Sequence, residues 1–443
     1  FIFKSNLFIL ILYMKYNLKQ EQLKLVCINL SEEIKRDDKL LTNKDITIFN
    51  SSILQLKNSD NLLIASRGWY GNVRSWDGIN FVILSLFSKN MKKLRQNILD
   101  IDPNLIKNKE IEFKEFKHEI IPHEKHILEG PEDPRLFYHN DQIYILVNEL
   151  NKNKEETPRH MFVSKVNLEK LEYDVNKDNL CEELSTKFEK NWGSFIHNKK
   201  LHMLYDINPL KILEVNDDFK CKMVCNINDK VLKKIYESYP ELNFHIRNST
   251  NLVDLGSEKY LGMGHGVLDY KGNSNLNKYL VPAIDKSEYS NDDKAYFKKF
   301  FKLYTAFFFI LDMKKKEITE LSPFFQLPNY ESKQELILFP SSIYLDKDNY
   351  VNISYSVGDN RSYFVKLHLD IIKISLYDKN NIDLQVNHNI NPNYYIELIR
   401  NIRKLMGYNV LKKDYYKFKD VNKTLSSRGA KTKKKSKKKS KKR

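Results

Sequence analysis

An all-β protein, a five-bladed β-propeller followed by a C-terminal amphipathic helix and a disordered basic tail, is predicted by three features of this 443-residue sequence. Short runs rich in Ile, Val, Leu, Tyr and Phe alternate with turns of Asn, Asp, Lys and Gly, a pattern typical of strands. Five such stretches share one design. Apolar residues at helical spacing follow near the end of the chain, and then a Lys-rich run.

Each of the five stretches reads as a β-hairpin with polar residues at both ends. The first and last residues of each lie 15 to 17 positions apart, in the stretches Asn50–Arg67, Asp133–Glu149, Asn191–Asp206, Asn248–His265 and Ser341–Ser356. A hairpin returns the chain to its starting edge, so these polar ends should lie side by side. Five repeats of this kind suit the five blades of a propeller, whose inner strands surround one axis. The polar ends either converge on a common funnel or simply end solvated strands.

The rest of the chain divides around this repeat. We expect an N-terminal extension over 1–44, the propeller over 45–375, a helical segment over 376–420 and a disordered Lys-rich tail over 421–443. The helix is predicted by an i, i+3, i+4, i+7 spacing between a proline and a glycine. Its apolar residues are Tyr395, Leu398, Ile399, Ile402, Leu405 and Met406.

Composition excludes several classes of protein. With 41% hydrophobic and 30% charged residues, the chain is too apolar for a disordered protein and too polar for a membrane protein. The run Leu7–Tyr13 is too short to span a bilayer and lacks a following cleavage site. We therefore expect a cytoplasmic protein that starts at Met14 and has no transmembrane span, with an uncleaved membrane-proximal anchor as the alternative.

The four cysteines and the basic tail add little chemistry. The cysteines match neither a disulfide-stapled scaffold nor a structural zinc site, which favours a reducing compartment. They are Cys27, Cys181, Cys221 and Cys225. The segment Arg428–Arg443 has eleven Lys or Arg residues and no acid, so it carries most of the net charge of +17. We expect a solubilising or targeting tail with the capacity to contact nucleic acid or anionic surfaces.

The string Gly130-Pro-Glu-Asp-Pro-Arg135 carries the sharpest chemical signal. Two prolines stiffen a segment that holds two adjacent acids, Glu132 and Asp133, beside Arg135. A neighbouring arginine tunes the pKa of a carboxyl group and partial burial raises it. Such a group can donate a proton to a leaving glycosidic oxygen. The alternative is a salt-bridged turn.

This string resembles the signature of glycoside hydrolase family 130, the β-mannoside phosphorylases, which share a five-bladed propeller. Further similarities follow in the family's order, over roughly 45–369. They are Phe49-Asn50-Ser-Ser-Ile, Ala65-Ser-Arg67, Pro158-Arg159-His-Met-Phe-Val-Ser, Lys190-Asn-Trp-Gly-Ser-Phe, Gly264-His265-Gly and Ser354-Tyr-Ser-Val-Gly-Asp359.

The resemblance implies an inverting transfer of a mannosyl or similar unit, with Asp133 as the general acid. Phosphate, or the phosphates of a nucleotide sugar, would meet positively charged residues and a histidine. These are Arg159, Lys190, His265 and Arg247. Sugar hydroxyls would meet Asn50, Arg67, Glu132, Arg135, Asp206 and Asp359. No cofactor or metal is expected.

Two departures from the family leave the reaction open. Asp206 stands where phosphorylases tend to carry His-Arg, and Arg247 lies where the family has Pro-Pro, so it restores a positive charge. The same scaffold resembles glycosyltransferase family 108, β-1,2-mannosyltransferases that use a nucleotide sugar. We expect a mannoside or oligosaccharide substrate with either phosphate or GDP-mannose. The alternatives are a propeller glycoside hydrolase and a non-catalytic glycan-binding propeller.

Overall fold

The structure is a computed structural model that describes residues 26–72, 77–101, 130–150, 159–174, 177–184, 189–230, 232–233, 244–269, 302–322, 327 and 338–379. All of them belong to one compact unit, 24–323 with 327–384. Strands make up nearly all of its regular structure, which confirms the all-β prediction. The predicted C-terminal helix, the Lys-rich tail and the run Leu7–Tyr13 lie outside the described residues.

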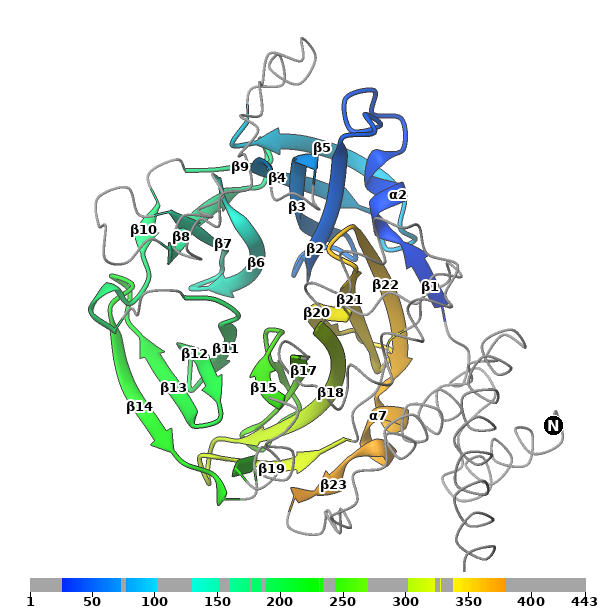
Figure 1. The fold of residues 1–443 in the computed structure, drawn as a ribbon. Coiled ribbons are helices and arrows are strands. Elements are labelled where there is room, and N and C mark those ends of the chain that lie inside the picture. Colours follow the sequence, from blue (N-terminus) through cyan, green and yellow to red (C-terminus); the bar gives the residue numbers. More distant parts are fainter. Residues whose placement is uncertain are drawn as a thin grey trace, which may run out of the picture. The chain divides into compact units, whose positions relative to one another are not determined.

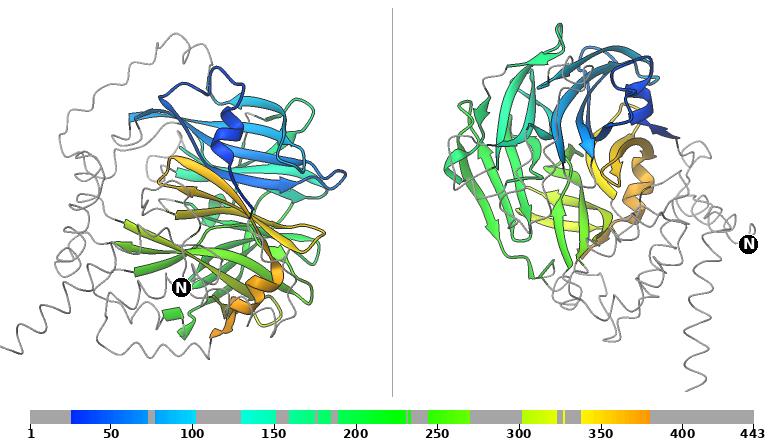
Figure 2. Two further views of the ribbon diagram at one scale, coloured as in Figure 1. Left: turned by 90° about the vertical axis from the view of Figure 1, so that its right-hand side faces the viewer. Right: turned by 45° about the horizontal axis from the view of Figure 1, so that its top comes forward.

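The strands of the described residues form four hydrogen-bonded sheets. The largest has the order β20-β21-β22-β2-β3-β4-β5, and β1 also pairs with β22. Its strands are β20 (Leu338–Leu345), β21 (Tyr350–Val357), β22 (Arg361–His368), β2 (Ile46–Gln55), β3 (Leu62–Asn72), β4 (Asp77–Phe87), β5 (Lys93–Leu99) and β1 (Val26–Asn29). Two antiparallel groups, one early and one late in the chain, therefore share this sheet (Figures 1 and 2).

Three smaller sheets hold the middle of the chain. The second sheet contains β6 (Glu132–His139), β7 (Gln142–Leu150), β8 (Arg159–Asn167), β9 (Glu172–Tyr173) and β10 (Asp178–Asn179). The third contains β11 (Gly193–His197), β12 (Lys200–Ile207), β13 (Leu210–Val215) and β14 (Cys221–Ile227). The fourth contains β15 (Phe244–Asn248), β16 (Val253–Asp254), β17 (Lys259–Asp269), β18 (Lys302–Asp312), β19 (Glu317–Leu321) and β23 (Tyr377–Asp378). The helices of the described residues are short: α2 (Leu30–Lys35), α7 (Leu369–Ser375) and the 3-10 turn η3 (Glu182–Leu184).

All five predicted hairpins form, and the paired residues at their ends lie within two positions of the predicted polar ends. In the first three, Phe49 lies opposite Arg67, Glu132 opposite Asn148 and Gly193 opposite Leu204. In the other two, Arg247 lies opposite His265 and Phe339 opposite Ser356. The strands that open these hairpins, β2, β6, β11, β15 and β20, face a common centre in Figure 1, and β2 contacts both β6 and β20. Polar groups from distant parts of the sequence are thereby brought together.

Small hydroxyl groups join these inner strands where side chains must be short. Ser52 Oγ on β2 accepts a hydrogen bond from the Leu136 backbone N on β6 at 2.9 Å. Ser342 Oγ on β20 accepts one from the Ile53 N at 2.7 Å. Both serines are buried. Because buried backbone N–H groups need partners, the serines satisfy donors that have no ladder partner at these points.

The opening strands of three hairpins have an irregularity at the same place. The register shifts between Phe49 and Ser52 on β2 and between Glu132 and Arg135 on β6, and it shifts likewise on β20. Asn50 and Asp133 each have a φ of 49° there. Asn and Asp tolerate this left-handed region better than other non-glycine residues. A bulge re-aims the side chain that it carries, so the fold turns Asn50 and Asp133 away from the regular alternation.

The first elements of the described chain, β1, α2 and β2, pack against β22 and so join the two strand groups of the largest sheet. β1 pairs with β22, and β2 meets β22 through one parallel pair, Ile48 with Arg361. Ser31, buried in α2, donates to the Ile48 carbonyl at 2.6 Å and accepts from the Ser362 N at 2.7 Å. Residues 26–35, within the predicted N-terminal extension, thus pack into this sheet.

One disulfide corrects the expectation of reduced cysteines. It joins Cys181, just after β10, to Cys221 on β14, and their Cα atoms lie 4.9 Å apart. The bond links the second sheet to the third. Cys27 and Cys225 are free thiols. In a separate finding, no helix among the described residues has the length and apolar character needed to cross a membrane.

Replacing Ser31 with Ala tests the closure of the largest sheet. The variant leaves one buried carbonyl and one buried N–H without their partner, so we expect unfolding to need about 1–3 kcal/mol less free energy. Urea denaturation followed by circular dichroism measures the difference. Ser257→Ala, at an exposed turn, is the matched control and should stay within about 0.5 kcal/mol of the parent. Equal stability of the two variants would show that Ser31 does not brace the sheet.

Candidate active site

Four charged side chains meet where the hairpin ends converge, and we call them the ionic cluster: Arg67, Glu132, Asp133 and Arg159. Arg67 lies on β3, the two acids begin β6, and Arg159 begins β8. The side chains are 8%, 17%, 21% and 11% exposed, in that order. Four largely buried charges persist only if they are paired.

Asp133 is held by two donors. Its Oδ1 atom accepts from Asn50 Nδ2 at 2.6 Å and from Arg67 Nη1 at 3.1 Å. Burial raises the pKa of the Asp133 carboxyl, but the Arg67 charge and the Asn50 hydrogen bond outweigh it and bring the pKa below its ordinary value. Asp133 is therefore ionised at neutral pH in the unliganded site, in contrast to the proton-carrying group that an acid role requires.

Glu132 bridges the two arginines. Its Oε1 atom lies 3.0 Å from Arg67 Nη2, 3.1 Å from Arg159 Nη2 and 3.4 Å from Asn80 Nδ2. Arg159 also donates through Nη1 to Asn148 Oδ1 at 2.8 Å. The resemblance to family 130 predicts that Glu132 contacts the sugar and Arg159 the phosphate. In this structure they hold each other, which leaves less of the Arg159 charge for an anion.

Two asparagines outside the predicted set of site residues orient these arginines. Asn80 on β4 and Asn148 on β7 are buried, and Asn80 Oδ1 accepts from Arg67 Nε at 2.7 Å. Each stands in an otherwise apolar strand, within Ile79-Asn-Phe-Val-Ile-Leu84 and Ile143-Tyr-Ile-Leu-Val-Asn148. A polar residue in such a run is costly unless it has buried partners, and this is the signal that identifies them.

A second group of side chains is cationic and contains His265, Lys190 and Arg247. His265 on β17 is buried, and its Nδ1 shares a 2.6 Å hydrogen bond with Ser249 Oγ. Burial, together with the positive charges of Arg247 and Lys190, holds the pKa of His265 well below its ordinary value. His265 is thus neutral at neutral pH. The positive charge of this group is carried by Lys190 and Arg247, which are exposed.

Arg135 lies between the two groups. It was predicted to bind sugar, but its Nη1 atom donates to the backbone carbonyls of Ser249 and Ser341, which belong to two other segments of the chain. Its Nη2 is buried and has no hydrogen-bond partner among the described residues. Burial lowers the pKa of Arg135 to about 10, against the opposing charge of Asp133. Arg135 therefore braces the centre of the site.

The two remaining predicted residues, Asp206 and Asp359, differ in their surroundings. Asp206 Oδ1 accepts from the backbone N of Ile207 at 2.8 Å, so this carboxylate caps its own turn. Asp359 has a φ of 50° in the turn after β21. Burial raises the pKa of Asp359 to about 6, opposed by Arg67 and aided by Asp133 and Glu132. Asp359 therefore stands in the field of the ionic cluster.

Together the two groups form a site with a division of charge. One group combines carboxylates and guanidinium groups that suit hydroxyl-rich ligands, and the other contains Lys190 and Arg247. Lys190 acts electrostatically on both Asp359 and His265, and so connects the two groups. Among the described residues, no cluster of three or more His, Cys, Asp or Glu side chains is arranged to hold a metal ion.

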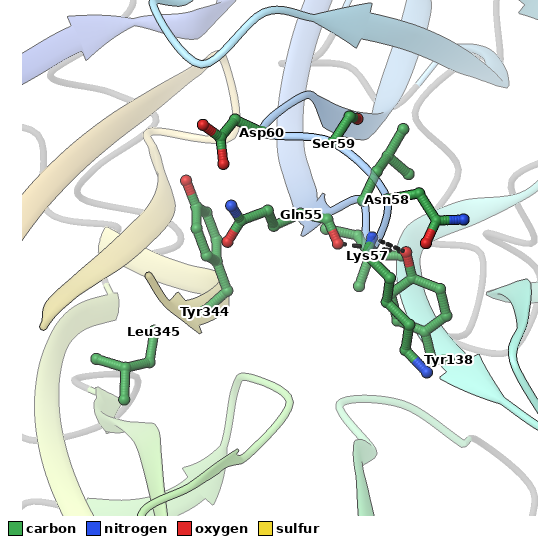
Figure 3. Close-up of a pocket in the computed structure, with 10 residues that line it drawn as sticks. Gln55, Lys57, Asn58, Ser59, Asp60, Tyr138, Tyr344 and Leu345 are labelled. Atoms are coloured by element: carbon green, nitrogen blue, oxygen red, sulfur yellow. Dashed lines mark hydrogen bonds between the residues drawn. The ribbon is translucent and has the colours of Figure 1, made fainter. Parts of the chain in front are cut away.

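A separate pocket of about 740 Å³ opens at the turn ends of the same hairpins, away from the ionic cluster. Figure 3 shows Gln55, Asp60 and Tyr344 along one part of it and Lys57 with Tyr138 along another. The Lys57 ammonium is already paired with Asp141 at 2.6 Å, and Asp60 with Lys347 at 3.3 Å. The pocket shares no residue with the site described above.

Comparisons with known proteins give structural likeness alone. No protein-family model matches the chain, and no curated protein sequence matches it. MPT-4, a mannose phosphorylase from Leishmania mexicana solved with phosphate, is similar with a TM-score of 0.44 and 12% identity over 75% of this chain and 86% of its own. MPT-1, a GDP-Man-dependent mannosyltransferase from the same organism, has a TM-score of 0.38 and 11% identity over 73% and 86%. β-1,2-Mannobiose phosphorylase from Listeria innocua has a TM-score of 0.42 and 12% identity over 75% and 94%.

The raised pKa of Asp359 has a consequence for stability. Above pH 6 the folded protein carries this carboxylate ionised against its preference, whereas the unfolded chain ionises it near pH 3.8. The folded state therefore loses stability between these values, by about 2–3 kcal/mol in total. We expect Asp359→Asn to gain stability over the parent as pH rises from 4 to 7. Melting temperatures across this range measure it.

The exposed Asp348→Asn is the matched control and should show no such trend. If the stability difference between Asp359→Asn and the parent stayed constant with pH, the raised pKa of Asp359 would be contradicted.

Proposed function

We propose that this chain is a carbohydrate-active enzyme that transfers a mannosyl or similar glycosyl unit with inversion. The observation that carries the proposal is the field shared by the two groups: Lys190 acts on Asp359 together with Asp133 and Arg67, and it acts on His265 together with Arg247. A five-bladed propeller suits this proposal, with the largest sheet read as two blades: β20–β22 with β1, and β2–β5. The resemblance of the Glu-Asp-Pro-Arg string to family 130 points in the same direction.

Asn50 and Asp133 supply the contacts for a sugar. Asn50 Oδ1 is buried without a hydrogen-bond partner among the described residues, while its Nδ2 holds Asp133. A hydroxyl group that donates to this oxygen satisfies it. The amide and the carboxylate together match neighbouring hydroxyls of a pyranose, one of which donates to each oxygen.

The charge state of Asp133 favours transfer toward a sugar acceptor. In this direction the acceptor hydroxyl attacks the anomeric carbon, its proton passes to the ionised Asp133 carboxylate, and the bond to a phosphate or diphosphate oxygen breaks. The departing anion needs no proton, and Lys190 and Arg247 stabilise its charge. By microscopic reversibility, Asp133 returns the proton as a general acid in phosphorolysis, in agreement with the role that the resemblance implies.

A hydrolase is the second candidate, and one observation favours it. Asp133 and Asp359 have pKa values displaced in opposite directions, down for Asp133 and up to about 6 for Asp359. Such a pair fits an inverting glycosidase, in which Asp133 activates water and Asp359 protonates the leaving oxygen. Asp359→Asn separates the two readings, because only hydrolysis of an unactivated glycoside needs a proton from Asp359.

Replacing Asp133 with Asn tests the central role. We expect turnover to fall by at least about 100-fold, because the proton acceptor is lost, while the anion is still bound. The purified enzyme is offered mannose 1-phosphate and GDP-mannose separately with a panel of sugar acceptors, and donor consumption is measured. Asp218→Asn, in the exposed β13–β14 turn, is the control and should leave turnover unchanged. Full activity of the Asp133 variant would exclude its role in proton transfer.

Replacing Arg247 with Ala tests the anion side. Loss of an ionic contact to phosphate should weaken binding of the donor or of inorganic phosphate by about tenfold. Isothermal titration at constant ionic strength measures the dissociation constant. Arg36→Ala is the control, because it removes the same charge at an exposed position distant in the sequence. It should change the dissociation constant little. An unchanged dissociation constant in the Arg247 variant would place the anion elsewhere.

A further inference from the structure

The Arg67 guanidinium has three different acceptors at once. Its Nε donates to Asn80 at 2.7 Å, its Nη1 to Asp133 at 3.1 Å, and its Nη2 lies 3.0 Å from Glu132. A guanidinium is planar and rigid. Fixing Nε therefore fixes the directions of the other two nitrogens, and Asn80 is the residue that fixes it.

Asn80 is fully buried, and both ends of its amide are in use. The Oδ1 atom accepts from Arg67, and the Nδ2 atom approaches Glu132 Oε1 at 3.4 Å. This position needs one acceptor and one donor on the same group. Asparagine supplies both, whereas an aspartate has no donor and would place a third negative charge beside Glu132 and Asp133.

The backbone of Asn80 also supports the segment that carries the acids. Gly130 has a φ of +82°, and a Cβ atom built there would lie 2.2 Å from the Asn80 carbonyl oxygen. Only a glycine permits this approach. The start of the Gly-Pro-Glu-Asp-Pro-Arg string thus rests on β4 at the residue that also orients Arg67.

We propose that Asn80 is a positioning residue, whose amide fixes Arg67 so that a single guanidinium holds Asp133 and Glu132 together. It does not touch the substrate. The inference deepens the proposed glycosyl transfer and rests on it only for its kinetic readout. The charged groups that face Asp133 are Arg67, Arg135, Glu132, Arg159 and Asp359. Of these, Arg67 is the one that Asn80 controls.

Titration of the Asp133 carboxyl tests this without any substrate. Aspartate labelled with carbon-13 at the side-chain carboxyl is incorporated into the full chain, and the Asp133 signal is assigned by its loss in Asp133→Asn. We expect Asn80→Asp to weaken the acidity of Asp133 by about tenfold or more, because it adds a third carboxylate that competes with Asp133 and Glu132 for the Arg67 charge. Asn80→Ala should shift the titration of Asp133 in the same direction by a smaller amount, because Arg67 Nε loses its hydrogen-bond acceptor.

Asn97→Asp, on the neighbouring strand β5 of the same sheet, is the matched control. It adds an equal charge opposite Leu84, four residues along β4, and should leave the Asp133 titration in place. Circular dichroism verifies that each variant is folded, and Asn80→Ala serves if the aspartate variant does not fold. An unmoved Asp133 titration in a folded Asn80 variant would overturn the proposal and leave Asn80 a packing residue.

The kinetic readout separates this inference from the proposed function. For transfer to an acceptor, the acidic limb of the pH profile of kcat/KM should move upward with the Asp133 titration. If an Asn80 variant had a lower kcat/KM at every pH but an undisplaced acidic limb, the positioning role of Asn80 would be contradicted. If no donor is turned over, the proposed function fails, whereas the titration still supports or refutes the role of Asn80.

Discussion

The organisation of the site depends on one carboxylate oxygen, Glu132 Oε1, which two guanidinium groups share. Arg67 and Arg159 reach it from β3 and β8, at 3.0 and 3.1 Å. Removing one member of such a buried set leaves an uncompensated charge, which typically costs about 3–5 kcal/mol. The positions of three strands are therefore tied to one point. This constraint also explains why Arg159 is less available to an anion than its place in the sequence predicts, and why Lys190 and Arg247 carry that role in the proposal.

The backbone reaches this arrangement through local strain and long-range bracing. Asn50 and Asp133 adopt left-handed φ values at equivalent bulges, and conformations of this kind persist only where surrounding contacts hold them. Those contacts are present: Asn50 and Asp133 bond to each other, and Arg135 crosses from β6 to the carbonyls of Ser249 and Ser341. Ser249 in turn bonds to His265. A continuous set of contacts thus joins the acidic side of the site to the cationic side.

Proton positions follow from the same geometry. Asp133 is hydrogen-bonded by Asn50 and Arg67 and loses its proton, while Asp359, which burial and the charges of Asp133 and Glu132 disfavour as an anion, keeps its proton up to about pH 6. His265 stays neutral among cations. An ionised Asp133 is prepared to accept a proton rather than to give one. Glycosyl transfer from an activated donor to a hydroxyl group needs this ionised carboxylate. Phosphorolysis or acid-assisted hydrolysis needs a substrate whose binding protonates Asp133.

The sequence by itself determined the all-β class, the five hairpins and the identity of most charged groups that meet at their ends, because alternation and turn residues are local signals. Charge pairing depended on tertiary structure, since Arg67, Glu132 and Arg159 are separated by tens of residues and their partners are set by strand neighbours. The same holds for Asn80, which acts through Arg67, and for Arg135, whose acceptors are backbone carbonyls without a sequence signature. The direction of the Asp133 pKa also required coordinates, because burial and Arg67 oppose each other and only distance decides which prevails.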